Sequence, residues 1–97
     1  MRVISRRKLR EFWEIHPDSR VALEAWFHDV EQANWKNPSD IKLIYRNASF
    51  LASNRIVFNI KGNHYRLVVV VVYQYEVVYI RYIGTHAEYD QIDAERI

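Results

Sequence analysis

Residues 55–83 read RIVFNIKGNHYRLVVVVVYQYEVVYIRYI. Three segments rich in valine, isoleucine and tyrosine, Arg55–Ile60, His64–Tyr73 and Val77–Ile83, are separated by short turns. Because β-branched and aromatic residues favour extended backbone, the stretch predicts an antiparallel meander of three strands. The run Val68–Val72 makes the middle strand apolar on both faces, which indicates a central and covered position in the sheet.

The first turn of the meander sets which side chains share a face. Gly62 and Asn63 both tolerate positive φ and suit a two-residue turn, and a four-residue turn over 61–64 keeps the same pairing. Asn59 then lies opposite Arg66. Since side chains alternate along a strand, polar and apolar residues separate onto two faces. The polar face is expected to carry Asn59, Lys61, His64 and Arg66, and the core face Phe58, Ile60, Tyr65 and Leu67.

The second turn decides where Arg81 points. With Tyr75-Glu76 as a two-residue loop, Val70 pairs with Arg81, and Arg81 joins the face of Arg66. A three-residue loop turns Arg81 to the other face. We expect the two-residue loop, because an arginine pointing into a helix-covered core would lose its hydration without gaining a partner.

The N-terminal half predicts the helices that cover this sheet. Ser5, Asp18 and Asn37 stand at cap positions, and apolar residues follow the second cap at three- and four-residue spacings. The expected segments are a strand over 1–4, helices over 5–15, 18–34 and 38–45, and a polar loop over 47–54. The sequence therefore predicts an α+β fold in one domain, 1–97. An N-terminal helical hairpin packs on a mainly antiparallel four-stranded sheet, and a short C-terminal helix follows.

That C-terminal helix begins at a recognisable signal. Thr85 and Glu88 have the spacing of a capping box, in which each side chain bonds the backbone of the other residue. His86 then lies in the first turn, with Tyr89 and Asp90 three and four residues further on. We therefore expect His86 and Asp90 to be in contact.

Composition narrows the class of protein. The 97 residues include no cysteine, which excludes disulfides, thiolate metal sites and a cysteine nucleophile. The longest apolar run falls far short of the roughly 20 residues of a membrane span, and no secretory signal is visible, so we expect a cytoplasmic protein. Net charge is only +2, yet residues 41–86 hold six Lys and Arg against one acid, Glu76. Such a local positive field attracts polyanions.

The arginine, lysine, histidine and tyrosine side chains of the hairpin and of the start of the C-terminal helix suit RNA cleavage by the neighbouring 2′-hydroxyl. That reaction needs a base and an acid for proton transfer and cations that bind the phosphate. Arg66 and Arg81 match phosphate oxygens bidentately. His86 can act as acid or base near neutral pH. Tyr65 or Tyr82 can stack a base. The acidic residues form no recognisable ligand set, so we expect neither a metal nor another cofactor. The alternates for proton transfer are Lys61, His64 and Tyr89.

Two groups of residues form a recognisable pattern: Phe58-Asn59-Ile60-x-Gly62-Asn63-x-x-Arg66-Leu67, then Tyr79-Ile80-Arg81 and Thr85-His86-x-Glu88-Tyr89-Asp90. With these motifs the chain resembles the HigB family of toxins from bacterial type II toxin-antitoxin systems, which is related to RelE. Trp35-Lys36-x-Pro38 and the N-terminal helical pair also fall in family order, so the likeness covers nearly the whole chain.

The resemblance implies a RelE-like fold and a metal-independent endoribonuclease, an mRNA interferase. Such a toxin cuts translated mRNA in the ribosomal A site and so inhibits translation and growth. It also implies a HigA-type helix-turn-helix antitoxin, with DNA contacted only through that antitoxin. The implied catalytic residues are Arg66, Arg81, His86 and Tyr89. The expected RNA-binding residues are Lys61, Asn63, His64 and Asn59, with Thr85 and Asp90 supporting. Lys61 stands where relatives carry glycine, which leaves a catalytic and a purely electrostatic role both open.

Two other functions fit parts of the sequence. A noncatalytic module that binds RNA or protein would use the same basic face. Direct DNA binding is disfavoured, because Pro17 lies at the turn of the helical pair and the second helix is acidic.

Overall fold

The computed structural model describes residues 1–97 and contains one mixed sheet with strand order β1-β5-β4-β3-β2. Three long antiparallel strands form its centre: β3 (Arg55–Ile60), β4 (Tyr65–Val72) and β5 (Val77–Thr85). The short β1 (Arg2–Ile4) runs parallel to β5 at one edge, and β2 (Ser49–Phe50) pairs with β3 at the other. The predicted meander is confirmed, and β4 is its central strand.

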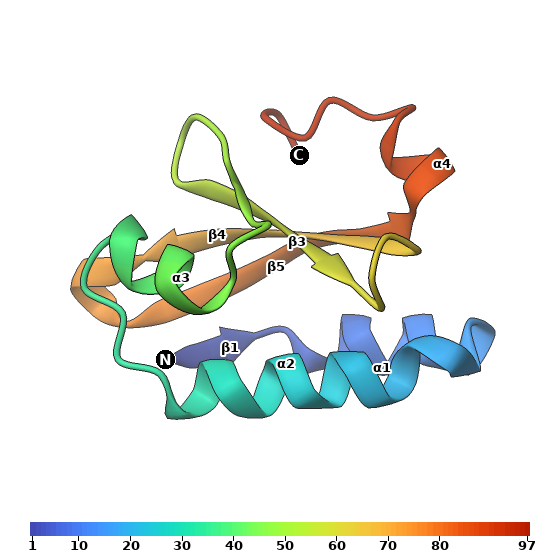
Figure 1. Ribbon diagram of the computed structural model, residues 1–97, viewed down its shortest axis with the longest axis horizontal. Helices are drawn as coiled ribbons and strands as arrows, with labels where there is room; N and C mark the ends of the chain where they lie inside the picture. Colours follow the sequence, from blue (N-terminus) through green and yellow to red (C-terminus); the bar gives the residue numbers. More distant parts are fainter.

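The helices divide between the two faces and one end of the sheet (Figure 1). α1 (Arg6–Ile15) and α2 (Arg20–Gln32) lie together on one face, joined by the short 3-10 helix η1 (Pro17–Ser19). On the opposite face lie α4 (His86–Tyr89) and the residues that follow it. This arrangement of helices on a mixed sheet confirms the α+β architecture. None of the helices combines the length and the apolar character needed to cross a membrane.

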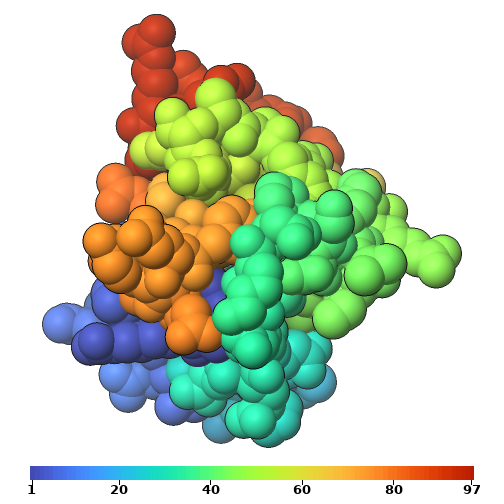
Figure 2. Space-filling model, turned by 90° about the vertical axis from the view of Figure 1, so that its left-hand side faces the viewer, coloured from blue at the N-terminus to red at the C-terminus, as the bar shows by residue number.

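α3 (Pro38–Ile44) lies at the end of the sheet where β4 turns into β5. Its start follows the predicted cap, since the Asn37 side chain accepts from the Asp40 backbone N–H at 3.1 Å. Figure 2 looks onto this end, where the segment leading into α3 lies beside the β4–β5 turn. An ion pair between Lys36 and Glu76, 3.9 Å apart, joins the two.

The core occupies both faces of β4, as its valine run predicts. Leu67, Val69 and Val71 are buried against α1 and α2 in the main cluster, with Leu9, Leu23 and Trp26 from the helices. On the other face Val68, Val57 and Ala94 form a smaller cluster, which the C-terminal segment covers with Tyr89, Ile92 and Ile97. Alternation along one strand thus gives an inner face, toward α1 and α2, and an outer face.

The sheet has five strands where four were expected. Residues 47–54 were predicted as a polar loop, but Ser49 pairs with Val57 and Phe50 with Ile56. A strand of two residues is too short to show alternation in the sequence, so only pairing with β3 reveals it. Phe50 stays exposed, whereas Leu51 packs on the outer cluster and anchors this segment.

The first hairpin has the predicted register, with Asn59 opposite Arg66 and Phe58 opposite Leu67. The turn is the four-residue form over 61–64, in which Lys61 and Gly62 have φ of 52° and 63°. The predicted pairing is therefore confirmed.

The second turn differs from the expected two-residue loop. Val72 pairs with Val77 and Val70 with Tyr79, so the turn spans four residues, 73–76, and closes on Glu76 at φ 56°. The predicted pairing of Val70 with Arg81 was wrong, because Tyr79 takes that position. The expected place of Arg81 on the face of Arg66 is also wrong, since Arg81 leaves the alternation and lies beside Lys8 and Glu11 of α1. A β-bulge follows, because Val69 pairs with Ile80 and Val68 with Tyr82, which leaves Arg81 as the extra residue.

One carboxylate ties the first hairpin to the helices. Asp18 was a possible cap for α2, but the residue at that position is Ser19, and neither side chain caps the helix. Instead Asp18 accepts from the Lys61 ammonium at 2.9 Å and from the Tyr65 hydroxyl. The bond from Lys61 is the main cause of a lowered Asp18 pKa, and the bond to Asp18 raises the pKa of Tyr65 to about 12.

We expect Asp18→Asn to lower the free energy of unfolding at pH 7, because the charge-assisted bond from Lys61 is lost. An acid whose pKa is lowered by folding stabilises above its unfolded pKa, and that contribution disappears as pH falls through the folded value. The free energies of unfolding of parent and variant, measured in urea, should therefore approach each other as the pH falls below about 4. A constant difference down to pH 2 would contradict this assignment.

Candidate active site

Arg66 is the centre of the polar end of the outer face. It lies between Asn59 on β3 and Gly84 on β5, each directly opposite it. Its guanidinium donates to the Asn63 side-chain oxygen at 3.0 Å and to the Asn63 carbonyl at 3.1 Å, and it forms no ion pair with any acid. Neutral acceptors thus hold the side chain in place while its charge stays uncompensated. Such an arginine suits an anionic ligand.

α4 positions His86 beside this arginine. Both bonds of the predicted capping box are present: Thr85 N–H donates to Glu88 at 2.8 Å, and Glu88 N–H donates to the Thr85 hydroxyl at 3.1 Å. The bond from the Thr85 backbone is the main cause of a lowered Glu88 pKa. His86 N–H donates to the His64 carbonyl at 3.0 Å, which joins the helix to the first hairpin.

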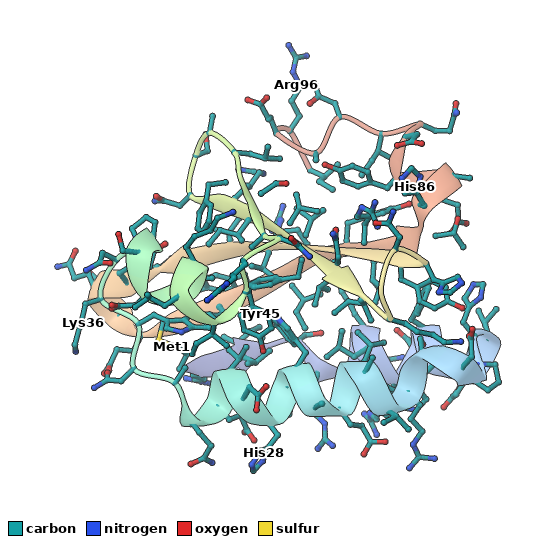
Figure 3. All side chains as sticks on the ribbon, viewed as in Figure 1. Met1, His28, Lys36, Tyr45, His86 and Arg96 are labelled. Carbon is teal, nitrogen blue, oxygen red and sulfur yellow. The ribbon has the colours of Figure 1, made fainter.

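The His86 ring is fixed by the predicted contact with Asp90. The His86 Nδ1 lies 3.1 Å from the Asp90 carboxylate, and both side chains are about half exposed. A carboxylate only accepts, so Nδ1 carries the proton in this contact and Nε2 is left without a partner. In Figure 3 His86 lies at α4, on the outer-face side of the sheet.

His64 has a similar arrangement at the hairpin. Its Nδ1 lies 2.9 Å from the Lys61 carbonyl, so Nδ1 donates and Nε2 stays free. The backbone bond from His86 N–H to the His64 carbonyl brings the two histidines together. The site therefore holds two histidines with an unengaged Nε2 near one uncompensated guanidinium in the sheet: His64 lies two residues before Arg66, and His86 lies two residues after Gly84, which is opposite Arg66.

Two tyrosines form the apolar side of this region. The Tyr82 ring lies over Gly84, and a side chain at Gly84 would collide with it, since an added Cβ would come within 2.8 Å of Tyr82 Cζ. Burial, and next the Glu88 carboxylate, raises the pKa of Tyr82, so its phenol stays protonated at neutral pH. Tyr89 packs on the outer cluster of Val57 and Val68, and its hydroxyl makes no hydrogen bond within the chain.

Arg81 lies apart from Arg66. It is exposed at the bulge, beyond the end of β1, in a hollow of about 330 Å³ that Lys8 and Glu11 of α1 also line. Since Gly84 is opposite Arg66, three residues of β5 separate the two arginines, or roughly 10 Å along the strand. Lys8 donates to the Ile80 carbonyl at 3.4 Å.

The other predicted residues divide between the two faces. Asn63 contacts Arg66, and Asn59 lies opposite it, as expected. Lys61 was expected on the same face, but its positive φ turns the side chain to Asp18, where Tyr65 also bonds. Tyr65 is buried and cannot stack a base. His28 is exposed, and His16 stacks on Phe12 with ring centroids 4.5 Å apart; neither ring makes a hydrogen bond to a residue of the site.

The sequence reading missed the Tyr82–Gly84 contact and the place of Lys8 beside Arg81. Gly84 lies within β5 and makes room for the Tyr82 ring. No three His, Asp or Glu side chains gather into a possible metal-ligand group.

Comparison with known proteins places this site in a class. A family model described as the RelE-like toxic component of a toxin-antitoxin system matches residues 19–92. The mRNA interferase toxin HigB of Escherichia coli K12 is 30% identical over 93 residues, which cover 93% of this chain and 88% of that protein. The mRNA interferase HigB of E. coli O6:H1 is 22% identical over 94 residues, which cover 95% and 91%.

The fold and the match together define a RelE-like toxin of a toxin-antitoxin system. Within that class, the chain belongs to the HigB toxin family.

We expect Gly84→Ala to destabilise the fold by about 1–3 kcal/mol, because the new methyl group overlaps the Tyr82 ring. Gly62→Ala is the control: nothing lies within 4 Å of an added Cβ there, and its cost is backbone strain of about 1–2 kcal/mol at positive φ. In double-mutant cycles measured by urea unfolding, Tyr82→Ala should couple to Gly84→Ala and not to Gly62→Ala. Additive effects at Gly84 and Tyr82 would refute the steric contact.

Proposed function

We propose that this toxin cleaves mRNA at the surface formed by Arg66, His64 and His86. The single observation that carries the proposal is the pair of imidazoles with free Nε2 atoms beside an arginine that no acid neutralises. Relatives across more than nine-tenths of the chain are named mRNA interferases, which supports the same chemistry. A noncatalytic binding role is not favoured.

The reaction uses the RNA's own 2′-hydroxyl. A base takes the 2′-hydroxyl proton, the oxygen attacks phosphorus, and the bond to the 5′-oxygen breaks as an acid gives that oxygen a proton. The products are a 2′,3′-cyclic phosphate and a 5′-hydroxyl. Arg66 donates to the phosphate oxygens as negative charge gathers in the transition state.

The histidines take the two proton-transfer positions. His86, oriented by Asp90, and His64, oriented by the Lys61 carbonyl, each present Nε2. Lys61 itself is engaged by Asp18, which favours its electrostatic role over a catalytic one. Tyr89 holds the outer cluster together and presents a free hydroxyl at the margin of the site.

Arg81 and Lys8 serve a second phosphate. Arg81 lies roughly 10 Å from Arg66 along the strand, so a single phosphate group of the RNA does not contact both arginines. Together with the basic residues of α1 it extends the positive surface beyond the cleaved bond. We assign Arg81 to binding a flanking phosphate and Arg66 to the phosphate that reacts.

The substrate context and the neutralising partner follow the family. The toxin acts on translated mRNA in the ribosomal A site, in the cytoplasm, and a HigA-type helix-turn-helix antitoxin neutralises it. Contact with DNA occurs only through that antitoxin.

We expect Arg66→Ala to slow mRNA cleavage by about 10²–10³-fold and to relieve growth arrest, because the reacting phosphate loses its donor. Arg81→Ala should instead weaken substrate binding, with a smaller effect on the rate at saturation. Lys36→Ala removes one exposed charge at the other end of the sheet, where Lys36 pairs with Glu76, and serves as the control. Single-turnover cleavage on programmed ribosomes, mapped by primer extension, measures all three.

Parent-like cleavage by a folded Arg66→Ala protein would sink the site assignment. Bound mRNA without cut ends from the parent chain would instead support the noncatalytic alternative.

We expect His86→Gln and His64→Gln each to reduce the cleavage rate by about 10²–10⁴-fold, because each removes one proton-transfer group. Asp90→Asn should have a smaller effect, since the amide can still accept from Nδ1. His28→Gln, on the outward face of α2, is the matched control. Cleavage rates against pH should lose one limb in whichever histidine variant removes the base. An unchanged profile in both variants would remove the histidines from the mechanism.

A further inference from the structure

The outer edge of β3 is only partly covered. β2 pairs with β3 at Val57 and Ile56 and then ends, so Phe58–Ile60 have no neighbouring strand on that side. The chain leaves this edge at Ala48 toward α3. A stretch of sheet edge therefore stays open between α3 and the first hairpin.

The open edge presents unpaired backbone groups. Leu51 N–H donates to the Arg55 carbonyl at 2.8 Å, so the polar groups of Arg55 face β2. Because these groups alternate along a strand, those of Val57 and Asn59 face the same edge. Neither the N–H nor the carbonyl of Asn59 has a partner there. An edge of this kind pairs with another extended chain.

A groove of about 330 Å³ lies along these groups. It is lined by Phe58 and Asn59 of β3, by Gly62 of the first hairpin and, from the segment at the end of α3, by Ile44, Tyr45 and Arg46 among others; we call this last part the wall of the groove. Ile44 is 65% exposed although it is an aliphatic residue at the end of α3. Tyr45 is held in this wall, because its hydroxyl donates to Asp29 of α2 at 3.2 Å (Figure 3). The groove thus combines strand-pairing groups with a fixed apolar wall.

The charges around the groove are positive. Neither Lys42 nor Arg46 forms an ion pair, and Lys42 donates to the Ala48 carbonyl at 2.9 Å. A ligand with acidic side chains would therefore gain the most. RNA would meet the positive charge but would leave Ile44 and the Asn59 carbonyl unused. An acidic peptide can use the positive charge, the exposed Ile44 side chain and the unpaired backbone groups of Asn59.

We propose that this edge groove receives an extended, acidic segment of the antitoxin, which adds a strand to β3 at Asn59. The inference rests on the proposed function, because a toxin of this class has a neutralising partner. An aliphatic side chain of the segment covers Ile44, and a carboxylate lies near Arg46. Only β3 lies between the added strand and β4, which carries Arg66. Bound antitoxin therefore also brings negative charge close to the site of the reacting phosphate.

Amide hydrogen exchange tests the pairing directly. The probe is the protein that is encoded beside this gene and suppresses growth arrest, purified as a complex with the full toxin chain. We expect the Asn59 amide to exchange at least 10-fold more slowly in the complex than in the free toxin. The amide of Val78, buried between β4 and β1, serves as the internal reference. An Asn59 amide that exchanges equally fast in both states overturns the proposal.

Two matched variants test the apolar wall. Ile44→Asp should raise the antitoxin Kd at least 10-fold, whereas Val21→Asp, at a residue 82% exposed on α2, should leave it unchanged. Both variants should cleave mRNA like the parent. Unchanged antitoxin affinity in Ile44→Asp overturns the proposal. If Ile44→Asp loses mRNA cleavage while its antitoxin affinity is unchanged, the groove binds RNA and the proposal is overturned. If the parent toxin forms a dimer that Ile44→Asp dissociates, the groove binds a second copy of the toxin and the proposal is also overturned. Failure of the proposed function is read separately, as absent mRNA cleavage by the parent chain.

Discussion

The pairing of β4 on both of its edges is the constraint from which the rest of the structure follows. β3 and β5 fix its two edges, so its alternate side chains must enter two different environments. Leu67, Val69 and Val71 meet α1 and α2, and Val68 meets the C-terminal segment. A shift of one residue would only exchange the valines between the two covered faces, but it would place Arg66 under the helices, at a large cost in free energy. The register is therefore strongly determined.

The candidate active site lies where the cover of the outer face ends. Along β4 the outward residues change from buried Val68 to half-buried Arg66, beside the hairpin turn. The C-terminal segment packs over Val57 and Val68, whereas α4 stands at the end of β5. The same segment thus completes the core and delivers His86 to the polar end. Stability and function share these twelve C-terminal residues.

Two basic residues of the hairpin have opposite electrostatic situations. Lys61 is paired with Asp18, and this contact fastens the turn to the junction of α1 and α2. Arg66 is held by neutral acceptors, the two oxygens of Asn63 and the Tyr65 carbonyl, and so keeps its attraction for an anion. The difference comes from backbone geometry, because the positive φ of Lys61 turns it away from the outer face. Two basic residues that are close in sequence therefore have different roles: Lys61 stabilises the fold, and Arg66 remains available to an anion.

Features that depend on near neighbours in the chain could be predicted from the amino-acid sequence. Period-two alternation and the turn at Gly62 gave the strands and the pairing of Asn59 with Arg66, and capping chemistry gave α4 and the contact of His86 with Asp90. Three features depend on contacts between distant segments: the two-residue β2, the bulge at Arg81 and the bond from Lys61 to Asp18. Lys61 and Asp18 are 43 residues apart, and no local pattern encodes a contact at that separation. Such contacts form only when distant segments are brought together by the burial of a shared core, which is why they were beyond the reach of a local pattern.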